Sequence, residues 1–163
     1  MTRALSILKL NLGCGKDLRR GYVNVDFTAG DVQWDLRKVP WPWLDNSADE
    51  ILMWHVLEHL PDTTDAMTEV RRILKPGGVF WGQCPYGPSH DGRTCWQHHR
   101  FFVARSFESM AVDFGMRVVR AENGVHSVNW RHKLRNLVPC RELLALAGWS
   151  EAFDKVDFKL VKL

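Results

Sequence analysis

The chain has 163 residues, of which 45% are hydrophobic and 25% charged, with a formal net charge of +3. This length and composition suit one domain, over residues 1–163, whose core is large enough to form without disulfides or metals as staples. No apolar run is long enough to cross a bilayer, and the first residues lead into a strand rather than a cleavable signal. We therefore expect a cytoplasmic protein with no membrane partner. The small positive charge does not by itself indicate a nucleic-acid-binding protein.

The cysteines are too widely spaced to suggest a disulfide framework or a cysteine zinc site. They contain no Cys-x-x-Cys pair, which is the usual local signature of such sites. We expect four free thiols, namely Cys14, Cys84, Cys95 and Cys140.

Apolar strand-like runs alternate with helical patterns along the chain, which is typical of a mostly parallel sheet flanked by helices. A helix is predicted from an N-cap at Asp62 to Leu74, and another over 107–114 ends at Gly115. An insertion with a short helix over 142–147 is predicted at 121–150, before the last strand. Strands are predicted near 6–12, 22–26, 50–54, 79–84, 116–120 and 156–161.

The first two predicted strands carry the features of a nucleoside-binding edge. The first strand ends in Gly13-Cys14-Gly15, and the second ends in Asp26. Glycines let a ligand approach bare backbone, and a carboxylate at the next strand tip can accept two hydrogen bonds from a ribose diol.

Further motifs follow in an order that narrows this interpretation. Over roughly residues 5–120, the chain resembles small class I methyltransferases that use S-adenosylmethionine. The motifs are Leu10-Asn11-Leu12-Gly13-Cys14-Gly15, Asp26, Trp34-Asp35-Leu36, the runs 40–45 and 46–51, His55-Val56-Leu57-Glu58-His59-Leu60 and Leu74-Lys75-Pro76-Gly77-Gly78.

The resemblance implies an α/β, Rossmann-like methyltransferase sheet, mostly parallel with an antiparallel last strand and helices on both faces. It implies that Asp26 holds the ribose, that Asp35 and Leu36 contact the adenine, and that His55 lies near the sulfonium. The full set of residues implied to bind S-adenosylmethionine is Asn11, Gly13, Cys14, Gly15, Asp26, Asp35, Leu36 and His55.

One segment departs from the usual pattern of the family. Only residues 16–21 separate Gly15 from the second strand, which leaves room for one helical turn at best. The chain in this respect resembles a subgroup of bacterial methyltransferases found among sugar and polysaccharide biosynthesis enzymes. Because the helix that would help neutralise the cofactor carboxylate is missing, Lys16 or Arg19 is expected to supply that charge.

The acceptor side is expected in the long loop over 85–102, which is rich in aromatic residues and histidines. Methyl transfer to a hydroxyl benefits from a base, and histidine suits that role at neutral pH. The candidate catalytic residues are His55, His98 and His99, and the candidate substrate residues are Glu58, His59, His90, Trp96 and Arg100.

No metal site is expected. The run His55-x-x-Glu58-His59 matches an inverted zinc-protease motif, but Pro61 ends any helix too early for it. A second grouping, His90, Asp91, Cys95 and His98, fits no standard ligand spacing.

The sequence thus predicts methyl transfer from S-adenosylmethionine to a small-molecule or glycan acceptor, through oxygen. Two alternatives stay open: a non-catalytic binding partner with the same fold, and a nucleic-acid methyltransferase, suggested by the basic residues between Arg117 and Arg141. The sequence leaves the oligomeric state open.

Overall fold

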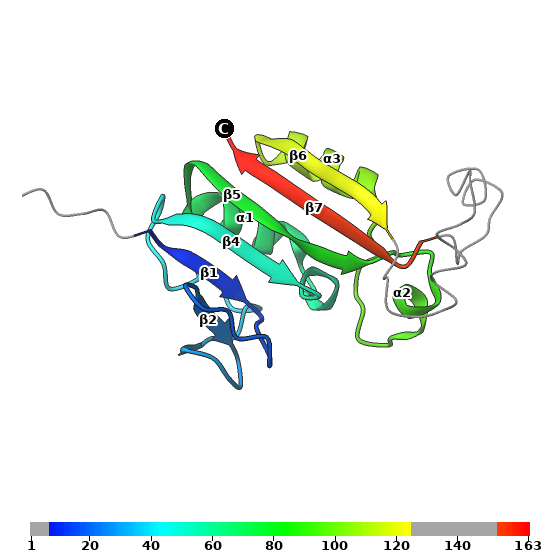
Figure 1. The fold of residues 1–163 in the computed structure, drawn as a ribbon, viewed down its shortest axis with the longest axis horizontal. Coiled ribbons are helices and arrows are strands. Elements are labelled where there is room, and N and C mark those ends of the chain that lie inside the picture. Colours follow the sequence, from blue (N-terminus) through cyan, green and yellow to red (C-terminus); the bar gives the residue numbers. More distant parts are fainter. Residues whose placement is uncertain (1–6, 125–152) are drawn as a thin grey trace, which may run out of the picture.

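The computed structural model describes residues 7–124 and 153–163. Figure 1 shows a central twisted sheet with helices packed behind it. The elements in chain order are β1 (Lys9–Leu12), β2 (Val23–Asp26), β3 (Val32–Gln33), β4 (Ala48–Trp54), the 3-10 helix η1 (Leu57–His59), α1 (Thr63–Ile73), β5 (Leu74–Pro85), α2 (His90–Thr94), α3 (Ala104–Asp113), β6 (Met116–Gly124) and β7 (Lys155–Lys162).

The sheet has seven strands in the order β3-β2-β1-β4-β5-β7-β6. Strands β1 to β5 pair in parallel, and β7 runs antiparallel between β5 and β6. This is the Rossmann-like topology that the family resemblance implied. The carboxyl ends of the parallel strands therefore meet at one edge (Figure 1), where open α/β sheets bind ligands.

The predicted strands and helices all form where residues are described, although several bounds differ. Residues 74–78, one of the motifs named above, belong to β5 because Leu74 pairs with Ala48. The two short elements β3 and α2 were not predicted. Of the predicted insertion, only 121–124 are described, and they continue β6; the helix over 142–147 lies outside the described residues.

Helix α1 begins as the sequence predicts. The carboxylate of Asp62 accepts hydrogen bonds from the backbone N–H groups of Thr64 and Asp65, which would otherwise be unpaired at the helix start. Helix α3 is followed by Gly115, whose φ of +58° a residue with a side chain adopts only with strain. Both helices thus have their ends defined locally.

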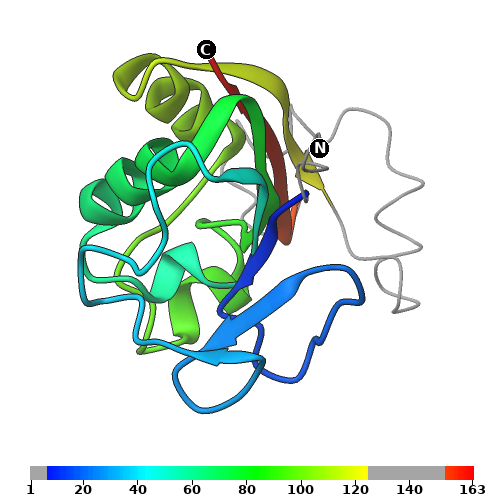
Figure 2. The same cartoon turned by 90° about the vertical axis from the view of Figure 1, so that its left-hand side faces the viewer.

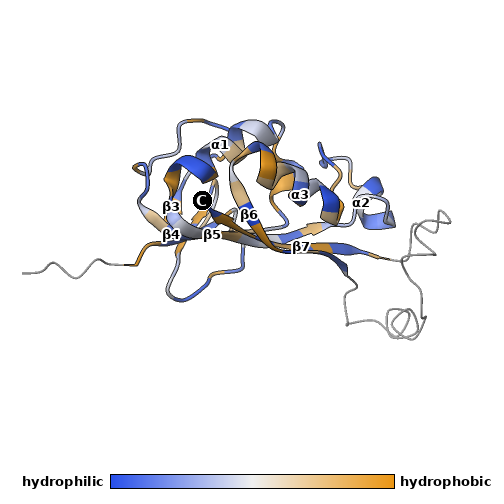
Figure 3. Ribbon diagram, turned by 90° about the horizontal axis from the view of Figure 1, so that it is seen from above, coloured by the Kyte–Doolittle hydropathy of each residue, from blue (hydrophilic) through white to orange (hydrophobic). Residues whose placement is uncertain are grey.

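The described helices α1, α2 and α3 lie on the same side of the sheet (Figures 2 and 3). The expectation of helices on both faces is therefore not met within the described ranges, since no helix links β1 to β2 or β2 to β3. On the other face, Arg19 from the loop after β1 lies over the rings of Trp54 and Trp81, 5.3 and 5.5 Å from their centroids.

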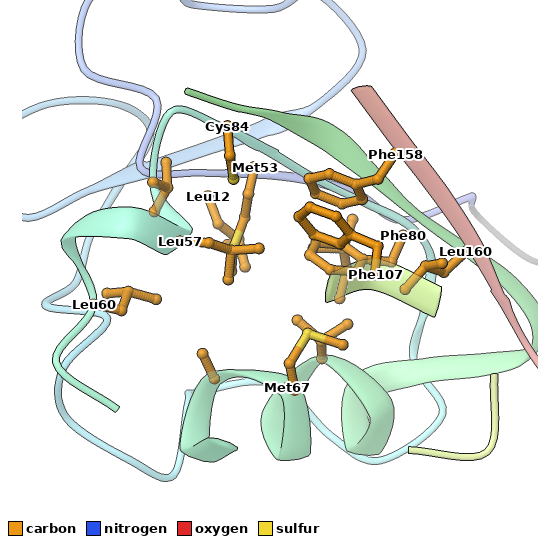
Figure 4. Packing of buried hydrophobic residues seen from close by; sticks show 14 of the residues in the cluster. Leu12, Met53, Leu57, Leu60, Met67, Phe80, Cys84, Phe107, Phe158 and Leu160 are labelled. Carbon is orange, nitrogen blue, oxygen red and sulfur yellow. The ribbon is translucent and has the colours of Figure 1, made fainter. Parts of the chain in front are cut away.

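The core fills the space between the sheet and the helices (Figure 4). Phe107 of α3 stacks on Phe158 of β7 with ring centroids 4.1 Å apart, and Met67 of α1 is fully buried below them. Burying one such side chain contributes about 1.5–3 kcal/mol, so this layer fixes the sheet on which the site is built.

Two further expectations from the sequence concern the cysteines and membrane-spanning segments. Within the described ranges, Cys14, Cys84 and Cys95 are free thiols as predicted, and Cys140 lies outside those ranges. None of the helices found among the described residues is long and apolar enough to cross a membrane.

Candidate active site

A cavity of about 540 Å³ opens at the carboxyl edge of the parallel strands. Its volume falls in the range of about 300–1,000 Å³ that is typical of small-molecule sites. The residues that line it come from the ends of β1, β2 and β4, from the loop after β3, from η1 and from the loop after α2: Gly13, Asp26, Phe27, Trp34, Asp35, Leu36, Arg37, His55, Val56, His59, Leu60, Trp96, Gln97 and His99.

Gly13 gives the cavity bare backbone at the end of β1. Its N–H donates a hydrogen bond to the carbonyl of Val25, and its φ is +70°. A Cβ at this position would come within 2.5 Å of Val56 Cγ2. Glycine is therefore required both by the backbone conformation and by the close approach of Val56.

Asp26 ends β2 with its carboxylate at the cavity. One oxygen accepts the N–H of Gly15 at 3.0 Å, and the other accepts the N–H and the hydroxyl of Thr28, each at 3.0 Å. Partial burial alone would raise the pKa of this carboxyl, but the hydrogen bonds from Thr28 and Gly15 outweigh it and lower the pKa. Asp26 is thus an ionised acceptor at neutral pH.

Asp35 also lies at the cavity, in the loop after β3. Its carboxylate accepts hydrogen bonds from Nε of Arg37 at 2.8 Å and from a terminal nitrogen of the same guanidinium at 2.9 Å. These bonds lower the pKa of Asp35 to about 2. The adjacent Leu36 lines the cavity with its apolar side chain, so an acid and an apolar surface stand side by side here.

His55 follows β4 in a conformation that is rare for a residue with a side chain, with φ of +55°. Its Nε2 is 3.2 Å from Oε1 of Gln83, and its Nδ1 is 3.3 Å from Oε1 of Glu58. Burial lowers the pKa of His55, but the hydrogen bond and negative charge of Glu58, together with Gln83, outweigh it and raise the pKa. Glu58 and Gln83 thus hold the ring in place and favour its charged form.

The acceptor end of the cavity is formed by η1 and the loop after α2. A backbone hydrogen bond of 2.7 Å from the N–H of His99 to the carbonyl of Glu58 joins these two segments. His59 and His99 line the cavity beside Trp96, whose side chain is 88% exposed. An exposed indole at a cavity mouth offers a flat apolar surface to an incoming molecule.

The structure does not bring all predicted site residues to this cavity. Glu58 is buried behind it, and His98 lines a smaller neighbouring pocket instead. His90 and Arg100 are exposed in the loop region and line neither pocket. Three further predicted residues do not line the cavity but support the residues that do: Asn11 of β1, and Cys14 and Gly15 of the loop after it.

Asn11 shows what such a supporting residue does. Its buried side chain donates hydrogen bonds to the carbonyl of Asp17 and to the side chain of Asn24. These bonds hold the loop after β1 without a helix. Arg19, expected to face the cofactor, donates to Asp17 and stacks on the tryptophans of the opposite face, so it does not line the cavity.

Six residues at the cavity were not predicted from the sequence: Phe27, Trp34, Arg37, Val56, Leu60 and Gln97. Trp34 and Arg37 flank the predicted pair Asp35-Leu36, and Phe27 follows Asp26 directly. Adjacency in the sequence to a predicted binding residue could therefore have indicated these cavity residues, although it does not say which neighbours face the cavity.

Comparison with known proteins agrees with this geometry. Residues 13–82 match the family model described as a methyltransferase domain. This segment thus resembles a methyltransferase domain, and the described residues have the class I methyltransferase fold. The match begins at the bare backbone of Gly13 and ends within β5, so it contains most of the cavity lining.

Two curated relatives align with parts of this chain. The sterol 24-C-methyltransferase ERG6B of Gibberella zeae is 43% identical over 49 residues, which are 30% of this chain and 12% of the relative. A Mycolicibacterium smegmatis protein named a probable S-adenosylmethionine-dependent methyltransferase is 35% identical over 78 residues, which are 45% of this chain and 28% of the relative. The aligned segments thus span less than a third of either relative.

A solved structure has the same fold as this chain. The Haemonchus contortus phosphoethanolamine N-methyltransferase 2, in complex with S-adenosyl-L-methionine, has a TM-score of 0.65 at 16% identity, over 99% of this chain and 50% of that chain.

The residues of this cavity fit S-adenosylmethionine, the cofactor of class I methyltransferases. The cavity combines bare backbone at Gly13, an ionised acceptor at Asp26, and an acid beside an apolar surface at Asp35 and Leu36. These groups match, in turn, a close-approaching ligand chain, a ribose diol and an adenine ring that offers an amine donor and flat faces.

Proposed function

We propose that this protein transfers a methyl group from S-adenosylmethionine to an oxygen of a small-molecule or glycan acceptor. One observation carries the proposal: the residues suited to the cofactor and the histidines suited to an acceptor line the same cavity. When bound, S-adenosylmethionine supplies an electrophilic methyl group on a sulfonium.

The cofactor would extend along the strand ends in this assignment. Asp26 would accept the ribose hydroxyls, and the loop at Gly13 would lie under the methionine part. Asp35 would exchange one of its bonds to Arg37 for the adenine amine, since a carboxylate can accept several hydrogen bonds at once.

The acceptor would enter from the side of η1 and Trp96. The indole of Trp96 would pack on a sugar ring or another flat acceptor and exclude water from it. His59 would orient the hydroxyl and His99 would take its proton, while His55, held by Glu58 and Gln83, would lie beside the reacting methyl group.

The choice of a small acceptor rests on the shape and charge of the described surface. The loop that carries Trp96 and His99 borders the cavity on one side. Of the basic residues between 117 and 141, Arg117 and Arg120 are described, and Arg120 is 2.9 Å from the carboxylate of Glu122. A nucleic-acid substrate would need unpaired cations in a row beside the site.

The test is a turnover assay that measures release of S-adenosylhomocysteine over a panel of nucleotide sugars, monosaccharides and phenols, with RNA and DNA oligonucleotides as a separate arm. We expect turnover with at least one hydroxyl-bearing small molecule and none with nucleic acid. Cofactor binding without turnover on any acceptor would favour the non-catalytic partner instead, and turnover on an oligonucleotide would replace the acceptor assignment.

A further inference from the structure

Next to the cavity, Glu58 is buried with fewer hydrogen bonds than a carboxylate requires. Its side chain is 1% exposed, and within the described ranges its carboxylate has no partner beyond the long contact with His55 and the neighbouring thiol of Cys84. The nearest charged group is the imidazole of His55, at 3.3 Å. A buried carboxylate is costly unless it is paired and hydrogen-bonded, so this one calls for a further partner.

Two histidines lie around this carboxylate. One carboxylate oxygen of Glu58 and one ring nitrogen each of His59 and His98 all lie within 4.8 Å of one another. His59 comes from the same 3-10 helix, whereas His98 comes from the loop after α2, and their ring centroids are 4.9 Å apart. Residues 40 positions apart thus present three possible ligand atoms to one point.

Both imidazoles are already oriented by backbone carbonyls. Nδ1 of His98 is 2.9 Å from the carbonyl oxygen of Gly92, and Nδ1 of His59 is 3.3 Å from that of Gln97. A proton on each Nδ1 would make these hydrogen bonds and leave the other nitrogen of each ring with a lone pair. Histidines that bind metals are commonly held in this way by a carbonyl behind the ring.

Cys84 packs close to the same carboxylate but does not supply the missing positive charge. A thiol carries no positive charge in either protonation state, so Cys84 does not balance the carboxylate. A cation from solution is the remaining source of charge besides His55.

We propose that Glu58, His59 and His98 bind one divalent transition-metal cation. Two imidazoles and one carboxylate suit Zn²⁺ and similar ions, and three protein ligands leave coordination positions open. Donor atoms on a tetrahedral Zn²⁺ stand about 3.3 Å apart, so the ligand atoms, now within 4.8 Å of one another, would have to approach by up to about 1.5 Å. The half-exposed rings of His59 and His98 can make that movement.

The open positions give the cation a function that rests on the proposed methyl transfer. The cluster lies between the main cavity, which His59 lines, and the smaller pocket, which His98 lines. A cation there would hold an acceptor hydroxyl by its oxygen and favour loss of the hydroxyl proton to bulk water. The acceptor would accordingly be a molecule that lies in the cavity and places a hydroxyl at the cation beside His59.

The test measures metal binding directly on the purified chain, after treatment with a chelator and dialysis. Zn²⁺ is titrated by calorimetry, and Co²⁺ binding is followed by its visible absorption. We expect one equivalent of Zn²⁺ to bind, with affinity at least about 10-fold lower in Glu58→Gln and in His98→Ala. His90→Ala is the matched control, because His90 is an exposed histidine outside the cluster, and its Zn²⁺ affinity should equal that of the wild type.

The results separate the metal site from the methyl transfer. Unchanged Zn²⁺ binding in the Glu58→Gln and His98→Ala proteins, with folding verified by circular dichroism, would overturn the site, and so would no binding by the wild type. If Zn²⁺ binds as expected and no acceptor is methylated, the metal site stands and the proposed function fails. Turnover that a chelator leaves unchanged would overturn the catalytic role of the cation.

Discussion

The backbone N–H of Trp41 donates a hydrogen bond of 2.6 Å to the buried carboxylate of Glu69 on α1. The same carboxylate accepts two hydrogen bonds from Arg72, whose guanidinium also reaches the carbonyls of Trp41 and Trp43. The segment between β3 and β4, which has no helix or strand of its own here, is thereby fixed to α1.

Glu69→Gln should therefore destabilise the protein. It removes the charge that pairs with Arg72 and turns one acceptor oxygen into a donor, at a cost of about 2 kcal/mol in the free energy of unfolding. Urea unfolding followed by circular dichroism measures the change. The control is Glu108→Gln on the exposed side of α3, which should unfold like the wild type. Equal stability of the two variants would show that Glu69 does not hold this segment.

Alkaline pH should expose the contribution of Tyr22. Burial, followed by the hydrogen bond from its hydroxyl to Glu50 and the charge of Glu50, raises the pKa of Tyr22 to about 12 from an ordinary 10.0. The neutral hydroxyl is thus favoured in the folded state, so its stabilising effect is complete below pH 10 and is lost as the pH rises towards 12.

The measurement compares the wild type with Tyr22→Phe, which cannot ionise at this position. The difference in unfolding free energy between the two proteins should shrink between pH 10 and pH 12. Because Tyr86 and the lysines are present in both, their titration cancels in the comparison. A difference that stays constant across this range would contradict the assignment.

The two glycines after β1 should respond differently to the same substitution. In Gly13→Ala the new Cβ would meet Val56 at 2.5 Å, whereas a Cβ at Gly15 would meet nothing within 4 Å. Both have positive φ, at +70° and +49°, so both alanines carry conformational strain of about 1 kcal/mol. Gly13→Ala should lose more stability and also cofactor affinity, measured by thermal unfolding with and without S-adenosylhomocysteine. Similar losses in both variants would argue against the close contact.

Trp96→Ala should separate acceptor binding from folding. The indole is 88% exposed yet lines the cavity, so its removal leaves the core unchanged. We expect the same melting temperature and S-adenosylhomocysteine affinity as the wild type, with a KM for the acceptor raised several-fold. A change in melting temperature instead would mean that Trp96 packs the loop.

Local patterns in the sequence were enough to predict α1. Asp62 caps its own helix, and the apolar spacing of Ala66, Met67 and Val70 is visible within one window. β3 could not be predicted in the same way, because two residues, Val32 and Gln33, pair only with β2 and bury little. The antiparallel β7 followed from the family resemblance rather than from periodicity.

The candidate site likewise contains residues that the sequence could predict and residues that it could not. Gly13, Asp26 and Asp35 follow strands, so the sheet topology brings them to one edge. The association of Glu58 with His98 depends on how the loop over 85–102 folds back, through the bond from His99 to Glu58. The spacing of residues in the sequence does not predict how this loop folds. The expectation of no metal site was therefore made without the proximity of His98 to Glu58.

The central claim is that Asp26 and the backbone at Gly13 hold the nucleoside of S-adenosylmethionine. Calorimetric titration of the wild type, Asp26→Asn and the surface control Asp113→Asn with S-adenosylhomocysteine tests it most directly. We expect binding by the wild type and Asp113→Asn, and affinity at least about 10-fold weaker in Asp26→Asn, since the amide loses a charged acceptor for the ribose diol. No binding by the wild type, or equal binding by all three proteins, would contradict it.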